Sequence, residues 1–201
     1  MFDLYKTIQA PTEGIYKEKG SKFLAFAYPF SQEASIKEQL AILQKQFHDA
    51  RHYCYAWRLE PEMTSYRIND DGEPSGSAGK PIYGQIVSRE LTDILVVVVR
   101  YFGGTKLGVG GLINAYRSAA SDALDHSKPI ECKVYDSLKL EFGYDRMNAV
   151  MKIIKDFQLD FKQQEFDMDC SLILKSWKRQ TERVVDSFSK ITECKISLIE
   201  E

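Results

Sequence analysis

The chain has 201 residues, of which 44% are hydrophobic and 28% charged, and its 27 Lys and Arg nearly balance its 29 Asp and Glu. This ordinary globular composition excludes a disordered or fibrous protein. A formal charge of -2 also excludes a protein that coats nucleic acid by bulk attraction, because such proteins carry a marked basic excess. Any nucleic-acid site must therefore be local.

The first part of the chain predicts a hairpin followed by a helix. Two β-rich runs, 14–19 and 22–30, flank Gly20-Ser21, which is typical of a two-residue hairpin turn. Apolar residues then recur at helical spacing over 36–47, and Ser35-x-x-Glu38 predicts a capping box at the start. We therefore expect an amphipathic helix after the hairpin.

The middle of the chain predicts two strands with different surroundings. Tyr53, Tyr55 and Trp57 share one face of a strand over 52–59, and this face either packs on the core, the commoner outcome, or forms a stacking platform for unpaired bases. The β-branched run Ile94–Val99 fits a central strand covered on both faces. The other elements expected here are a strand over 65–69 and helices over 81–88 and 112–124.

The last third of the chain has the order strand, helix, strand, strand, helix, strand, which is that of a ferredoxin-like split βαβ sandwich. Because Lys128-Pro129 breaks the preceding helix, we place a domain boundary near 129–133 and expect domains 1–130 and 131–201. The expected elements are strands over 134–142, 159–166, 168–174 and 194–199 and helices over 145–157 and 179–191.

A Gly-rich loop, residues 103–111, lies between the buried strand and the helix that follows. Its glycines leave backbone N–H groups free to face an anion at the positive helix end, and the window 94–121 holds three bases and no acid. The alternative is that the glycines serve a tight turn and close helix-to-sheet packing, and neither standard nucleotide motif is present. The candidate anion-binding or nucleic-acid-binding residues are Arg100, Gly103, Gly104, Lys106, Gly108, Gly110, Gly111 and Arg117.

An acidic loop, residues 70–79, clusters three carboxylates. Such a cluster holds a metal or acts as acid and base in some proteins, but this one lacks the alternating ligands and distal Glu of an EF-hand. A turn in which Asp side chains cap backbone amides is the commoner arrangement. The three His and four Cys also lack metal-ligand spacing, so we expect no metal, no cofactor and no catalytic residue.

The first six residues lack the basic region and apolar run of a signal peptide, and no stretch approaches the roughly 18 apolar residues of a membrane helix. We therefore expect a cytoplasmic protein with no membrane partner. Its cysteines are expected to be reduced, and Cys54, in a strand between two tyrosines, to be an inert buried thiol rather than a nucleophile.

Three blocks, Ala50–Ala56, Asp70–Ile82 and Val98–Leu112, resemble in the same order the signature blocks of the YigZ/Impact family. Ser77 stands where the family usually shows Thr, and both residues keep a hydroxyl. The family signature falls on the Gly-rich loop and on His52, Asp70, Asp71, Gly72, Glu73, Pro74, Gly76, Gly79 and Lys80.

The resemblance implies a first domain with the fold of ribosomal protein S5 domain 2, a sheet with two helices on one face, and a ferredoxin-like second domain. This pairing is similar to the fourth and fifth domains of elongation factor G, which makes RNA, the ribosome or a translation-associated protein the expected partner. Eukaryotic relatives regulate translation by binding a kinase activator partly through an extra domain, and that partnership is not expected here. The family supplies no catalytic residue to carry over.

The leading hypothesis is a noncatalytic cytoplasmic protein that binds RNA or a ribosome-associated partner and regulates translation. Two alternatives come from other classes: a small-ligand binder or enzyme that holds a phosphate at the Gly-rich loop, and a protein-interaction module. The sequence leaves the oligomeric state open.

Overall fold

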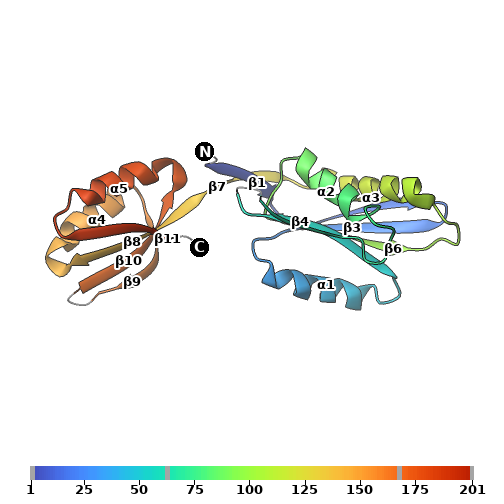
Figure 1. Cartoon of the computed structure of the whole chain (residues 1–201), viewed down its shortest axis with the longest axis horizontal. Coiled ribbons are helices and arrows are strands. Elements are labelled where there is room, and N and C mark those ends of the chain that lie inside the picture. The colour runs from blue at the N-terminus through green and yellow to red at the C-terminus, as the bar shows by residue number, and fades with distance from the viewer. Residues whose placement is uncertain (1–2, 62–63, 167–168, 200–201) are drawn as a thin grey trace. The chain divides into compact units, whose positions relative to one another are not determined.

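The computed structural model describes residues 3–61, 64–166 and 169–199, and Figure 1 shows its α+β architecture. The chain divides into two compact units. The first unit comprises residues 5–132, and the second comprises residues 133–201 with residues 1–4. No helix in the described part of the chain is long and apolar enough to cross a membrane.

The first unit is built on a five-stranded antiparallel sheet whose central strand is β6 (Ile94–Tyr101). Residues 94–100 of this strand are buried. This confirms the prediction, made from the continuous β-branched run, that the strand is covered on both faces. The sheet order is β2 (Thr12–Glu18), β3 (Ser21–Pro29), β6, β4 (His52–Leu59) and β5 (Ser65–Asn69).

Helices cover both faces of this sheet (Figure 1). On one face, Val98 packs in a core with α2 (Gly79–Ser88) and α3 (Gly108–Asp125). On the other face, Val97 packs in a second core with α1 (Ala34–Gln46). The resemblance implied two helices on one face, and α1 adds a third layer.

The local details of β2, β3 and α1 differ from those predicted. The two turn residues of the hairpin are Lys19 and Gly20, with φ of 46° and 80°, so the turn lies one residue earlier than expected. The capping box is wrong, because α1 begins at Ala34 and Ser35 therefore lies inside the helix. The residue before the helix, Glu33, makes no side-chain capping hydrogen bond.

The aromatic stripe of β4 belongs to the core. Tyr55 and Trp57 are buried in the layer between the sheet and α1, and the partly buried Tyr53 packs against the same cluster. Tyr53 also donates its hydroxyl to Phe47 O at 2.7 Å. The stripe is therefore not a base-stacking platform, and the core-facing alternative is confirmed.

The second unit has the predicted order of strands and helices. Its antiparallel sheet has the order β11-β8-β10-β9, and α4 and α5 lie on one face of it (Figure 1). Met168, part of an expected strand, lies outside the described residues. The elements are β8 (Tyr135–Gly143), η1 (Tyr144–Arg146), α4 (Met147–Asp156), β9 (Asp160–Glu165), β10 (Asp169–Trp177), η2 (Lys178–Gln180), α5 (Thr181–Ser189) and β11 (Cys194–Ile199).

Two further strands, β1 (Leu4–Ile8) and β7 (Pro129–Lys133), pair in a small sheet that the sequence analysis did not expect. Burial does not alternate along β1, and β7 begins at Pro129, which indicated only the end of the preceding helix.

Candidate functional site

The candidate site lies at the end of the first unit's sheet where β6 leaves it. Strand register places His52 of β4 directly opposite Arg100 of β6, and Phe23 of β3 opposite Arg100 on the other side. The chain then continues through Phe102 and the Gly-rich loop. The end of that loop, from Gly108, is already the first turn of α3, which begins earlier than the predicted residue 112.

A buried ion pair joins the acidic loop to this strand end. Arg100 Nη1 lies 2.5 Å from Glu73 Oε1, and the two side chains are only 7% and 4% exposed. Tyr116 of α3 donates its hydroxyl to the same Glu73 oxygen at 2.8 Å. The Glu73 carboxylate therefore ties the acidic loop to β6 and α3, the two elements that flank the Gly-rich loop.

Cys54 extends this network beneath the site. Its sulfur lies 3.0 Å from Asp70 O and 3.3 Å from Tyr116 Oη. Burial, with the nearby Glu73 charge, raises the pKa of the Cys54 thiol far above its ordinary value, and burial also raises the pKa of the Tyr116 hydroxyl. Both groups therefore stay protonated, as the interpretation of Cys54 as an inert thiol requires.

Arg100 was expected to face an anion, but most of its charge is committed elsewhere. It pairs with Glu73, and its guanidinium lies 5.4 Å from the ring centre of Phe23 and 5.7 Å from that of Phe102. Its Nε is buried and has no hydrogen-bond partner among the residues that the structure describes. Arg100 is thus mainly a structural connection, with one donor left over.

The acidic loop is a capping device. The Asp70 carboxylate accepts hydrogen bonds from the amides of Gly76 (2.8 Å) and Ala78 (3.0 Å), in the loop before α2, and of Gly79 (2.8 Å), the first residue of α2. Partial burial opposes ionisation, but these three bonds outweigh it and bring the pKa of Asp70 below its ordinary value. The interpretation of the loop as an Asp-capped turn is confirmed.

Asp71 and His52 fix the other side of the acidic loop. Asp71 Oδ2 accepts a hydrogen bond from the amide of Tyr53 at 2.6 Å, and His52 Nδ1 lies 2.8 Å from Asp71 O. Because a carbonyl oxygen only accepts, His52 Nδ1 carries the proton and Nε2 is the nitrogen left for a ligand.

We expect Asp70→Asn to destabilise the first unit by about 1 kcal/mol at pH 7, as the loss of a charged helix cap does. A carboxylate whose folded-state pKa is lowered stabilises fully above its ordinary pKa, near 4, and loses this effect as the pH falls through the folded value. The difference from the parent should therefore narrow toward pH 3. This difference in unfolding free energy is measured by urea unfolding followed by Trp57 fluorescence in a Trp177→Phe background. The control is Glu38→Gln, which changes an exposed carboxylate in α1 and should leave the urea unfolding curve unchanged at pH 7 and at pH 3.

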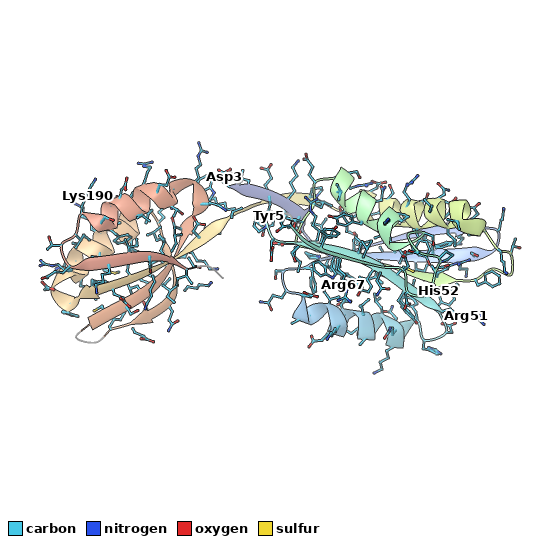
Figure 2. All side chains as sticks on the ribbon, in the orientation of Figure 1. Asp3, Tyr5, Arg51, His52, Arg67 and Lys190 are labelled. Carbon is cyan, nitrogen blue, oxygen red and sulfur yellow. The ribbon has the colours of Figure 1, made fainter. Side chains whose placement is uncertain are left out.

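A cavity of about 520 Å³, called the cleft below, opens between the two loops. Two of its basic side chains, Arg51 and Lys106, are exposed and have no ion pair within the described residues. Figure 2 shows Arg51 and His52 at the same end of the first unit. The cleft is lined by Arg51, His52, Glu73, Pro74, Arg100, Phe102, Lys106, Leu107, Gly108, Val109 and Leu112.

Four of the five predicted loop glycines differ in what surrounds them. A Cβ on Gly103 would lie 2.0 Å from the backbone carbon of Gly20, so Gly103 serves close packing, as the structural alternative predicted. Gly104 and Gly108 have φ of 86° and 70°. A Cβ on Gly110 would meet nothing within 4 Å, and the backbone there does not have a positive φ. Neither close packing nor backbone conformation therefore requires a glycine at this position.

The remaining predicted residues do not line the cleft. Arg117 is exposed on α3, and Gly103, Gly104, Gly110 and Gly111 lie beside the cleft in sequence without lining it. In the acidic loop, the backbone takes positive φ at Asp71 (41°), Gly72 (83°) and Gly76 (74°), and Gly79 packs against the backbone of Asn69. Lys80 is exposed.

Arg51 and Phe102 line the cleft but are not among the residues predicted from the sequence. Arg51 directly precedes His52, and Phe102 directly follows the buried strand, so each adjoins a residue or segment that had been singled out. Adjacency to a strand end is the signal that indicates them, because side chains at a strand's end reach the loops beyond the sheet.

A second cavity, of about 550 Å³, lies in the second unit at one end of β8 and β10. Its charged lining residues are Glu141, Glu193 and Lys195, so acids outnumber bases there and the lining does not suit an anion. Among the described residues, no three His, Cys, Asp or Glu side chains gather closely enough to hold a metal ion.

The family of the Impact N-terminal domain matches residues 19–124, just over half of the chain. The chain belongs to the IMPACT family. The matched range contains β4, both loops and the cleft, so the candidate site lies in the part of the chain that defines the family.

Relatives extend the likeness over both units of this IMPACT family chain. IMPACT family member YvyE of Bacillus subtilis is 32% identical over 163 residues, which is 81% of this chain and 75% of YvyE. An IMPACT family member of Haemophilus influenzae is 32% identical over 179 residues, 87% of this chain and 84% of its own. A crystal structure of a hypothetical protein matches the whole of both chains with a TM-score of 0.80 at 23% identity and thus shares the fold.

Proposed function

We propose that this protein is a noncatalytic cytoplasmic RNA-binding protein that acts in the regulation of translation and holds RNA at the cleft. The observation that carries the proposal is the composition of the cleft. Arg51 and Lys106 supply two positive charges with no ion pair in the described part of the chain, and the half-exposed Phe102 supplies an aromatic face. Phosphates and unstacked bases are the two groups by which proteins hold single-stranded RNA.

The folds assigned to the two units, each taken by itself, support the same proposal. We assign residues 1–130 to a domain similar to ribosomal protein S5 domain 2 and residues 131–201 to a ferredoxin-like domain. The second assignment rests on the sheet order β11-β8-β10-β9 with both helices on one face. Such a pair is similar to two domains of a ribosomal elongation factor, which favours RNA or a ribosome-associated partner.

One observation favours a second candidate, a binder of small phosphate-bearing ligands. A cavity of about 520 Å³ lies within the size range of small-molecule sites. A mononucleotide would then bind at least as tightly as an oligonucleotide, whereas an RNA-binding protein gains affinity from contacts along the strand.

We expect Arg51→Glu with Lys106→Glu to weaken binding of a single-stranded RNA oligonucleotide by at least about tenfold at low salt. If each residue contacts one phosphate, the slope of log affinity against log salt should fall by about 1.4. Fluorescence anisotropy across a salt series measures both. Arg100→Glu is unsuitable for this test because Arg100 is buried and paired.

The matched control is Lys37→Glu with Lys45→Glu, which makes the same charge change on α1 at the opposite face of the sheet. Affinity should stay within about twofold of the parent. An equal loss in both double variants would show that net charge alone attracts RNA, and no binding by the parent at low salt would exclude the RNA proposal.

A further inference from the structure

The charge of the cleft exceeds what an internal RNA phosphate requires. Arg100 and Glu73 neutralise each other, so the net positive charge of the cleft comes from Arg51, Lys106 and the N-terminus of α3. A helix N-terminus carries roughly half a positive charge. A phosphodiester brings one negative charge, whereas a terminal phosphate brings about 1.5 to 2 at pH 7. A terminal phosphate therefore matches the cleft more closely.

The first turn of α3 leaves room for such a group. Gly108 lines the cleft with φ of 70°, and a Cβ at either Gly108 or Gly110 would meet nothing within 4 Å. Gly110 does not line the cleft, so the space within the cleft at the start of α3 is that beside Gly108.

Arg100 gives an independent indication of a ligand. Its side chain lines the cleft and is only 7% exposed. Its Nε has no hydrogen-bond partner in the described ranges. A buried guanidinium nitrogen without a partner is unfavourable unless an acceptor is supplied from outside the chain. Arg100 lies in the wall of the cleft, so an anion bound there would face this incompletely paired guanidinium.

Two apolar side chains complete the surroundings. Phe102 is 50% exposed and Val109 is 54% exposed, and both line the cleft together with the basic side chains of Arg51 and Lys106. The ring of Phe102 already has the Arg100 guanidinium near one side at 5.7 Å. Its exposed surface is suited to stack a planar base, which is worth about 1–3 kcal/mol for each base.

We propose that the cleft recognises a nucleoside phosphomonoester, in which a terminal phosphate lies against the start of α3 between Arg51 and Lys106 and the base stacks on Phe102. This proposal rests on the proposed function, because the nucleoside phosphomonoester is expected to be the end of an RNA strand. The cleft would then bind the terminal nucleotide of that RNA. A free nucleotide has the same chemistry and is the second source.

The test compares one short RNA carrying a 5′-phosphate, a 3′-phosphate or hydroxyls at both ends, together with a nucleoside monophosphate and its nucleoside, by isothermal titration calorimetry. We expect a terminal phosphate to raise affinity at least about tenfold. RNA that binds equally well without one would overturn this inference and leave the proposed function standing. Binding of the monophosphate but of no RNA would support the inference and overturn the proposed function, and binding of neither would overturn both.

Two matched variants test the location. Gly108→Ala places a methyl group in the cleft at the start of α3, and Gly104→Ala places one in open space outside the cleft lining. Because φ is positive at both glycines, 70° and 86°, the two changes strain the backbone alike. Only Gly108→Ala should lose the gain in affinity from the terminal phosphate, and retention of that gain would show that the phosphate does not lie at α3.

Discussion

Replacing Glu73 with alanine is expected to lower the free energy of unfolding of the first unit by about 3–5 kcal/mol. The reason is that Arg100 would remain buried, at 7% exposure, with no carboxylate to balance its charge. Tyr116 would lose its acceptor at the same time. The measurement is urea unfolding followed by Trp57 fluorescence in a Trp177→Phe background, which separates the first unit from the second.

The comparison variant is Glu90→Ala, which removes the partner of Lys6 in an ion pair whose side chains are 45% and 74% exposed. Exposed pairs contribute about 0–1 kcal/mol, so this change should be nearly silent. Glu73→Leu combined with Arg100→Met should recover much of the stability lost in Glu73→Ala, because it removes both charges together. Equal effects of Glu73→Ala and Glu90→Ala would contradict the role we assign to the buried pair.

Elements that depend on local pattern were predictable from the sequence. β4 and β5 have the predicted bounds, and β6 is the central strand that its β-branched run indicated. The start of α3 was not predictable, because Gly108 to Gly111 have low helix propensity and are held in the helix by the packed turns after them.

The candidate site was predictable only in part, for a related reason. The Gly-rich loop and the acidic loop could each be recognised from residue type, but the contact that holds the acidic loop at the end of β6 links Glu73 to Arg100, 27 positions apart. No periodicity connects these two residues, so the sequence offered Arg100 as a free base. Its neutralisation appears only once β6 and the acidic loop are placed side by side.

Gly103→Ala is expected to destabilise the first unit by about 3 kcal/mol or more. The new Cβ would lie 2.0 Å from the carbonyl carbon of Gly20 and 2.1 Å from the amide nitrogen of Ser21, both of them backbone atoms of the β2–β3 hairpin. A flexible side chain could move aside, but these atoms are fixed by the hairpin register, in which Glu18 pairs with Ser21. Overpacking against such atoms costs about 1–3 kcal/mol or more because backbone must shift.

Gly110→Ala is the matched control, since it adds the same methyl group to the same glycine cluster in open space. It should raise the stability of the first unit by about 0.5–1 kcal/mol, because alanine favours the helix. Urea unfolding of both variants by Trp57 fluorescence in the Trp177→Phe background gives the two signs. If Gly103→Ala unfolded at the parent's urea concentration, the hairpin would not be packed against the Gly-rich loop. Opposite signs would show that the fold requires Gly103 for the close approach of the hairpin, whereas the space beside Gly110 is not used by the fold.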